Sequence, residues 1–234
     1  MNHEAIDKFA IDKFNELEKG ILEIIRAADI FTIELVQLRR GTDFAENLIK
    51  DLLRGKISSF VIFRDSYSQE EIEYLKREPR LQSIACQIVL ASYTALEVYL
   101  VNKFEEYLSF RMKNCPQGIK NAILKTIRFR DLKEIKKNYR DFIGIHIDKF
   151  EPGHFPVDYK SNFKKNTWWE SLLQISEARN EIAHRGISET TQLILLPDAW
   201  ECFDLCRRWV NLFNINFDRY IYKNELTDYV KRCL

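Results

Sequence analysis

The residues best suited to chemistry lie in the segment RNEIAH, residues 179–184. Asn180 and His184 are four residues apart, so a helix places them on one face. Arg179 precedes His184 by five residues, which turns its Cβ about 140° around the helix, although a long side chain can still reach the imidazole. A histidine can move a proton near neutral pH, and a guanidinium fork matches a phosphate. The pair predicts cleavage of RNA without a metal ion, with His184 acting on the 2′-OH or the 5′-oxygen and Arg179 stabilising phosphate charge.

The same segment also has a purely structural interpretation. Arg179 could pair with Glu177 or Glu181, and His184 could donate to the last carbonyls of its helix. Glu97, inside an apolar helix, has two readings as well, since it could hold Arg179 by a charge-assisted hydrogen bond or be an exposed helix charge.

The elements around the segment are predicted to be helical because glycine (7) and proline (5) are scarce. Hydrophobic periodicity and helix-stop residues predict helices over 4–39, 42–53, 68–79, 81–112, 119–127, 131–139, 168–184 and 198–222. Extended pieces are expected at 57–64 and 190–196, and an irregular loop at 148–165. Ser68 with Glu71 forms a capping-box pattern, and Asn166 or Thr167 is expected to cap the helix that carries RNEIAH.

Pro79 marks the predicted boundary between an N-terminal helical extension, residues 1–79, and a main helical domain, residues 80–234. The extension could bind a partner, contribute to a dimer or add packing, and the sequence leaves these three roles open.

RNEIAH fits the HEPN motif, in which an arginine and a polar residue precede a histidine. The segment ASYTALEVYL, residues 91–100, is similar to the first core helix of HEPN proteins. The chain thus resembles HEPN ribonucleases of the RiboL-PSP kind. The resemblance implies an all-α, HEPN-like bundle of four to five helices with the N-terminal helical extension. It also implies a metal-independent endoribonuclease without a cofactor, whose composite site joins two Arg-Asn-x-x-x-His motifs across a homodimer.

Carried over residue by residue, the resemblance makes Arg179 and His184 the catalytic pair and Asn180 their polar support. It implies an RNA substrate, a role as a toxin or antiviral-defence effector, and an antitoxin or defence-system protein as partner. Some HEPN toxins carry a tyrosine that is modified at the position of Gly186. Regulation by modification of this tyrosine is therefore not expected here. The alternative is a catalytically inactive HEPN module that binds RNA or a partner protein.

A basic stretch is the expected RNA-binding surface. Residues 111–140 hold ten basic and two acidic side chains, a local net charge of +8. The residues predicted to contact RNA are Lys125, Arg128, Arg130, Lys133, Lys136, Lys137 and Arg185. The alternative is an ordinary solvated helix face, and both can hold on opposite faces of one helix.

Composition and spacing argue against a polycationic protein, a secreted disulfide-rich protein, a cysteine metal site and a membrane protein. The formal net charge is +1, so any affinity for nucleic acid must come from local clustering. Five scattered cysteines do not resemble a secreted disulfide framework. Cys202 and Cys206 lack further ligands nearby, so we expect small buried side chains and no metal site. Polar residues interrupt the apolar window 81–101, which predicts a buried helix, no membrane contact and a cytoplasmic protein.

Overall fold

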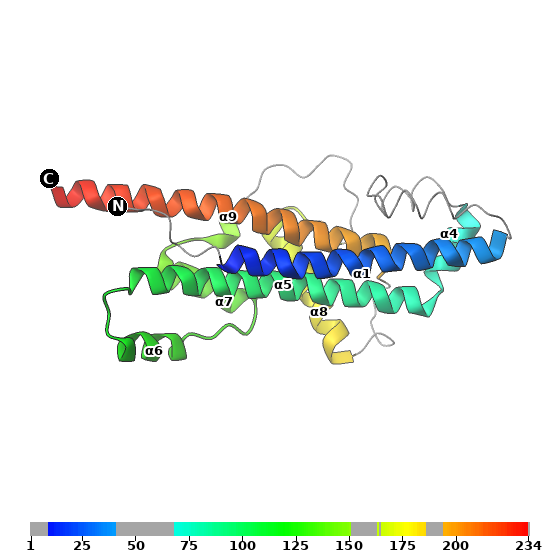
Figure 1. The fold of residues 1–234 in the computed structure, drawn as a ribbon, viewed down its shortest axis with the longest axis horizontal. Helices are drawn as coiled ribbons and strands as arrows, with labels where there is room; N and C mark the ends of the chain where they lie inside the picture. The colour runs from blue at the N-terminus through cyan, green and yellow to red at the C-terminus, as the bar shows by residue number, and fades with distance from the viewer. Residues whose placement is uncertain (1–8, 41–67, 151–162, 164, 186–193, 234) are drawn as a thin grey trace.

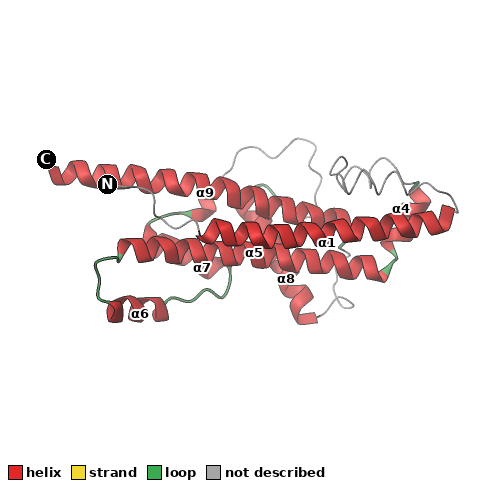
Figure 2. Ribbon diagram, viewed as in Figure 1, coloured by secondary structure: helices red, strands yellow, loops and turns green. Residues whose placement is uncertain are grey.

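The computed structural model describes residues 9–40, 68–150, 163, 165–185 and 194–233, with the backbone alone described at 37–40, 185, 218 and 221–233. The long helices are α1 (Phe9–Arg40), α5 (Pro79–Arg111), α8 (Trp168–Arg185) and α9 (Leu196–Cys233). The short helices are α4 (Gln69–Lys76), α6 (Gln117–Thr126) and α7 (Leu132–Asn138), and two irregular turns, η1 (Tyr139–Ile143) and η2 (Ile147–Lys149), follow α7. The described residues contain no strand, which confirms the predicted all-α fold (Figure 2).

Helix α5 is the central element of the bundle and packs against α1, α8 and α9 (Figure 1). Its buried residues point to several sides, as Ala95, Leu96 and Phe104 show. A helix that is apolar on most of its surface must be covered by neighbours. By length and composition α5 could also span a membrane, but over half of its most apolar window is buried inside the bundle. This agrees with the predicted buried helix.

A cluster of aromatic rings joins α5 to η1 and α9. The Tyr139 ring packs edge-on against Phe104, Phe213 and Phe217, with centroid distances of 5.4, 5.8 and 6.1 Å. Its hydroxyl donates to the carbonyl of Leu100 at 2.7 Å, so the buried phenol has its hydrogen bond. The cluster therefore attaches the segment after α7 to the bundle and fixes α7 beside α5.

Helix α1 lies within the predicted N-terminal extension, yet it packs along α5. Ala10, Phe14, Ile21 and Ile25 are buried at helical spacing, and the Phe14 ring meets Tyr99 edge-on at 5.9 Å. The extension and the main domain therefore share one hydrophobic core. The division at residues 79 and 80 stays a prediction.

Local sequence signals explain where several helices begin. Ser68 Oγ accepts from the backbone of Glu71, whose carboxylate accepts from the backbone of Ser68, as predicted. Thr167 and Glu170 form the same reciprocal pair at the start of α8. Pro79 occupies the first turn of α5, where its missing N–H does no harm.

Several predicted boundaries were wrong by two residues or more, among them the starts of α5 and α6, and three of the differences have a local cause. Helix α9 begins at Leu196 instead of 198, because the Asp198 carboxylate accepts from the backbone N–H of Leu195 and so acts inside the first turn. It also continues to Cys233 instead of ending at 222, since no glycine or proline interrupts it. The helix predicted over 131–139 splits at Tyr139 into α7 and a π-helical turn that ends at Gly144, whose φ is 81°. The helix predicted at 42–53, the extended piece at 57–64 and most of the predicted loop lie outside the described residues, as does most of the extended piece at 190–196.

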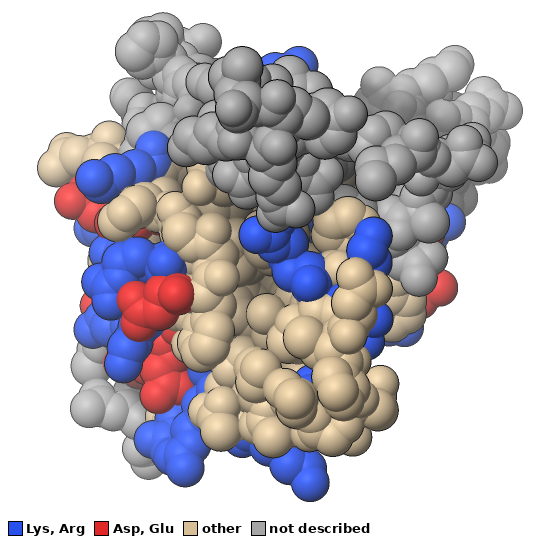
Figure 3. Space-filling view, turned by 90° about the vertical axis from the view of Figure 1, so that its left-hand side faces the viewer, with Lys and Arg blue, Asp and Glu red and all other residues tan. Residues whose placement is uncertain are grey.

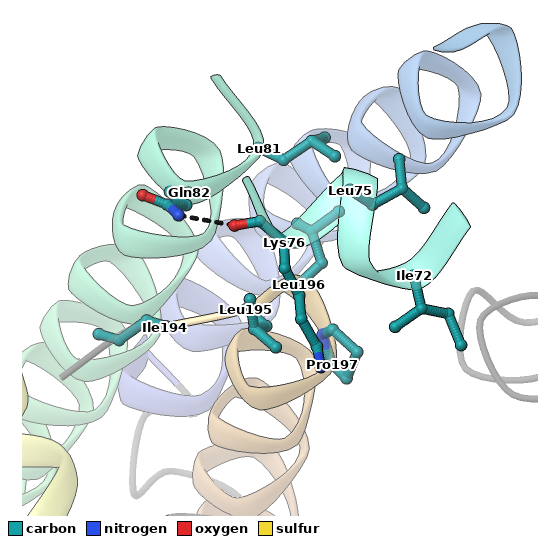
Figure 4. Close-up of a pocket in the computed structure, with 9 residues that line it drawn as sticks. All are labelled: Ile72, Leu75, Lys76, Leu81, Gln82, Ile194, Leu195, Leu196 and Pro197. Atoms are coloured by element: carbon teal, nitrogen blue, oxygen red, sulfur yellow. Dashed lines mark hydrogen bonds between the residues drawn. The ribbon is translucent and has the colours of Figure 1, made fainter. Parts of the chain in front are cut away.

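A small cavity lies where α4 and the first turns of α5 and α9 meet (Figure 4). It measures about 60 Å³ and is lined by aliphatic side chains, including Leu75, Leu81 and Leu196. The Gln82 side chain beside it donates to the backbone carbonyl of Lys76 at 2.8 Å. Apart from Gln82 and Lys76, whose ammonium pairs with Glu73 at 2.7 Å, the described lining is apolar, so we treat the cavity as a packing feature.

Candidate active site on helix α8

Helix α8 carries all three predicted catalytic residues. Its buried stripe, which includes Leu172, Ile175 and Ile182, packs on α5 and α9. Asn180 is half-buried beside this stripe, and His184 lies exposed in the last turn. In Figure 1 the end of α8 that leads toward the start of α9 projects away from the bundle. The imidazole is therefore presented to solvent by a helix whose other turns are held in place.

Among the described residues, Arg179 has three partners. Its Nη1 donates to Asn180 Oδ1 at 3.0 Å, and its Nη2 lies 3.9 Å from Glu97 Oε2. The guanidinium carbon stands 5.6 Å from the centre of the Tyr93 ring, within cation–π range. The arginine side chain is 33% exposed and the glutamate 21%. Arg179 is thus held by its own helix and by α5, with part of its surface open to a ligand.

Tyr93 connects the same two helices a turn earlier. Its hydroxyl and Ser176 Oγ are 2.8 Å apart in a buried hydrogen bond. Burial raises the pKa of Tyr93 well above its usual range, so the phenol stays neutral. Neither Tyr93 nor Ser176 was predicted as part of the site. The available signal was the spacing of Tyr93 and Glu97, one turn apart on the predicted core helix.

The Glu97 carboxyl has a raised pKa. Burial has the largest effect and raises it, the Arg179 guanidinium and the Tyr93 hydroxyl lower it, and Asp131 raises it again. The net direction is upward because the two favourable contacts do not restore what the carboxylate loses in hydration. The sequence left open whether Glu97 contacts Arg179 or is an exposed helix charge. The structure shows the contact, at a distance longer than a hydrogen bond. Asp131 is the N-cap of α7, so the start of α7 is close enough to act on this site.

No hydrogen bond or ion pair joins Arg179 to His184 within the described part of the chain. The two side chains do not meet because a spacing of five residues places their Cβ atoms on different sides of the helix. One chain therefore presents an anchored guanidinium and an exposed imidazole as separate groups.

The predicted RNA-binding residues lie on α6, on α7 and between them. Lys125, Arg128, Arg130, Lys133 and Lys137 are exposed. Lys136 is half-buried and pairs with Asp148 at 2.7 Å, so its charge is already partly neutralised. Figure 3 shows the face that lies at the left of Figure 1, where α6 is, and more of its surface is blue (lysine and arginine) than red (aspartate and glutamate). Arg185 ends α8, and its side chain lies outside the described atoms.

Cys202 and Cys206 on α9 were predicted to be small buried side chains. Both are buried in the packed face of this helix, as predicted. Among the described residues no three histidine, cysteine, aspartate or glutamate side chains gather as metal ligands would.

The chain was expected to resemble a HEPN family, and a family match supports this. The model of the family described as RiboL-PSP-HEPN matches residues 57–218, well over half of the chain, and the match includes α5, α7 and α8. No curated protein and no solved structure gives a significant match. The chain belongs to the RiboL-PSP-HEPN family.

Proposed function

We propose that this protein is a metal-independent endoribonuclease of HEPN type, acting at a composite site made by two Arg-Asn-x-x-x-His motifs in a homodimer. The main support for the proposal is that the two catalytic side chains of the motif lie in different environments. Arg179 is anchored by Asn180, Glu97 and Tyr93, whereas His184 is exposed at the projecting end of α8. Cleavage of a phosphodiester requires both an anchored group that stabilises charge and an accessible group that transfers a proton.

In the proposed mechanism His184 moves the proton of the attacking 2′-OH or of the leaving 5′-oxygen. Arg179 stabilises the negative charge that develops on the phosphate, and Asn180 holds the guanidinium through its Oδ1. Attack by the 2′-oxygen breaks the bond to the 5′-oxygen, which leaves a 2′,3′-cyclic phosphate and a 5′-hydroxyl end.

A second copy of the chain completes the site. Arg179 and His184 do not contact one another within the described residues of one chain. The exposed last turn of α8 can meet the same turn of a partner across a two-fold axis, which is the usual symmetry of homodimers. The arginine of one copy would then face the histidine of the other.

The exposed cations of α6 and α7 would hold the RNA backbone. Asp131 lies among them in the sequence and acts on Glu97, so the basic surface begins close to Arg179. As setting we propose a cytoplasmic toxin or antiviral-defence effector, with an antitoxin or defence-system protein as a further partner.

The test is incubation of the purified full chain with single-stranded RNA in excess EDTA. We expect cleavage that yields 2′,3′-cyclic phosphate and 5′-hydroxyl ends, with a rate per chain that rises with protein concentration until the dimer is saturated. Cleavage that EDTA abolishes would overturn the metal-independent mechanism, and a rate per chain that is constant below the dimer dissociation constant would overturn the composite site.

A second candidate is a catalytically inactive module that binds RNA or a partner protein. The separation of Arg179 and His184 within one chain favours it, because an unpaired motif can serve packing alone. RNA that is bound by the dimer but left uncut would establish this alternative.

The basic surface gives its own prediction. Changing Arg130, Lys133 and Lys137 to glutamine should weaken binding of single-stranded RNA and lower the slope of log affinity against log salt by about 2, at roughly 0.7 per lost phosphate contact. Binding is measured by fluorescence anisotropy in a His184→Ala background, so that the RNA stays intact. The matched control changes Lys13, Lys19 and Arg26, three exposed cations of α1, to glutamine. An equal loss in both triple variants would mean that only net charge matters.

A further inference from the structure

Tyr93 and Glu97 are polar residues at the interface between α5 and α8. They stand one turn apart on α5, next to the buried apolar residues Leu96 and Leu100. Polar groups in such surroundings lower stability unless partners satisfy them. Each has a partner on the helix that carries the HEPN motif: Ser176 for Tyr93 and Arg179 for Glu97.

We propose that Tyr93 and Glu97 are positioning residues that hold the Arg179 guanidinium in place for an RNA phosphate. The inference rests on the proposed ribonuclease function and adds two residues from a helix outside the motif. Neither touches the substrate, and each acts through Arg179.

Glu97 orients the guanidinium without occupying its donors. The distance from Nη2 to Oε2 is 3.9 Å, beyond hydrogen-bond range, so the attraction is electrostatic. Within the described residues, the side-chain hydrogen bond of Arg179 uses Nη1 and goes to Asn180 Oδ1. An arginine has five N–H donors, and donors therefore remain for a phosphate.

Tyr93 supplies a fixed surface under the guanidinium. Its hydroxyl is tied to Ser176, three residues before Arg179 and one turn earlier on α8. Its ring faces the guanidinium carbon at 5.6 Å. Because the ring is held at its hydroxyl end and is only 1% exposed, it cannot swing away when Arg179 binds a ligand.

A purely stabilising role does not account for Glu97. The groups that act on it are Arg179 from α8, Tyr93 from α5 and Asp131 from the start of α7, and with burial they leave its pKa raised. A carboxyl whose pKa is higher in the folded than in the unfolded state favours folding most when protonated. Its contribution is present at low pH and is lost as pH rises through the folded-state pKa. At pH 8 an uncharged glutamine should therefore leave thermal stability unchanged or raise it.

The experiment compares Glu97→Gln with Glu105→Gln, an exposed glutamate of the same helix. For Glu97→Gln we expect kcat on single-stranded RNA to fall roughly 10- to 100-fold, the scale of a misplaced catalytic group, with KM little changed and Tm at pH 8 equal or higher. Glu97→Asp should recover part of the rate, and Tyr93→Phe, which keeps the ring but loses the Ser176 bond, should lose less than Glu97→Gln. Glu105→Gln should match the wild type. Wild-type kcat in Glu97→Gln, or a loss of rate that only follows a fall in Tm, would overturn the inference.

A second readout separates this inference from the ribonuclease proposal. The Arg179 Nε–H resonance, assigned by its absence in Arg179→Lys, should show restricted guanidinium rotation in the wild type and faster rotation in Glu97→Gln. This holds whether or not the protein cuts RNA. An unchanged resonance would overturn the positioning role, whereas a shifted resonance in a protein that leaves RNA intact would overturn only the proposed reaction.

Discussion

His184→Ala is expected to reduce RNA cleavage by at least about 1,000-fold, within the range that general acid–base catalysis contributes. The imidazole is the group in the RNEIAH segment that can both accept and donate a proton near neutral pH. Because the side chain is exposed and α8 is anchored by Leu172, Ile175 and Ile182, its removal should leave Tm and the dimer unchanged. Single-turnover cleavage of a labelled RNA, measured together with thermal unfolding, checks both statements.

The matched control is His146→Ala, which removes an exposed histidine in the turn after η1. It should cut RNA at the wild-type rate. If His184→Ala also retains the wild-type rate, proton transfer by the motif histidine is wrong. If both variants lose activity together, the effect comes from the fold and not from the motif.

The sequence predicted the helices well because their signals are local. The Ser68 and Thr167 capping boxes, the proline in the first turn of α5 and the spacing of Phe14, Ile21 and Ile25 each depend on residues a few positions apart. The HEPN motif is local too, since all of its residues lie in one turn and a half of α8. Such features can be found without knowing how the chain folds back on itself.

Glu97 and Asn180 were expected partners of Arg179, but the Tyr93 ring beside its guanidinium could not be predicted in the same way. Tyr93 and Ser176 are 83 residues apart, and only the packing of α8 on α5 brings them together. Asp131 reaches Glu97 because α7 is fixed beside α5 through the Tyr139 ring cluster. The early start of α9 was missed for a smaller reason, because the sequence predicted Asp198 as the first residue of the helix, whereas it is the third and accepts from Leu195 within the first turn.

Arg179→Lys is expected to lower kcat on RNA by about 100- to 1,000-fold, as the loss of a charge-stabilising donor does in other enzymes. Lysine keeps the positive charge but presents a single ammonium in place of a planar fork. It cannot both approach the Tyr93 ring, as the guanidinium does at 5.6 Å, and offer parallel donors to a phosphate. Arg26→Lys, at an exposed arginine of α1 that pairs with Glu23 at 2.8 Å, is the matched control and should be silent. Full activity in Arg179→Lys would mean that charge alone is needed at this position.

A double variant at Arg179 and Glu97 should show whether Arg179 is needed for RNA cleavage or for thermal stability. Arg179→Ala removes the cation that lowers the pKa of Glu97, so a half-buried carboxylate is left without it and Tm at pH 8 should fall. Adding Glu97→Gln removes the stranded charge, and Tm should return toward the wild-type value. Cleavage should stay lost in both variants, because the guanidinium is still missing. Recovery of cleavage together with Tm would show that Arg179 serves the fold, whereas recovery of Tm alone would show that its guanidinium is needed for the reaction on RNA.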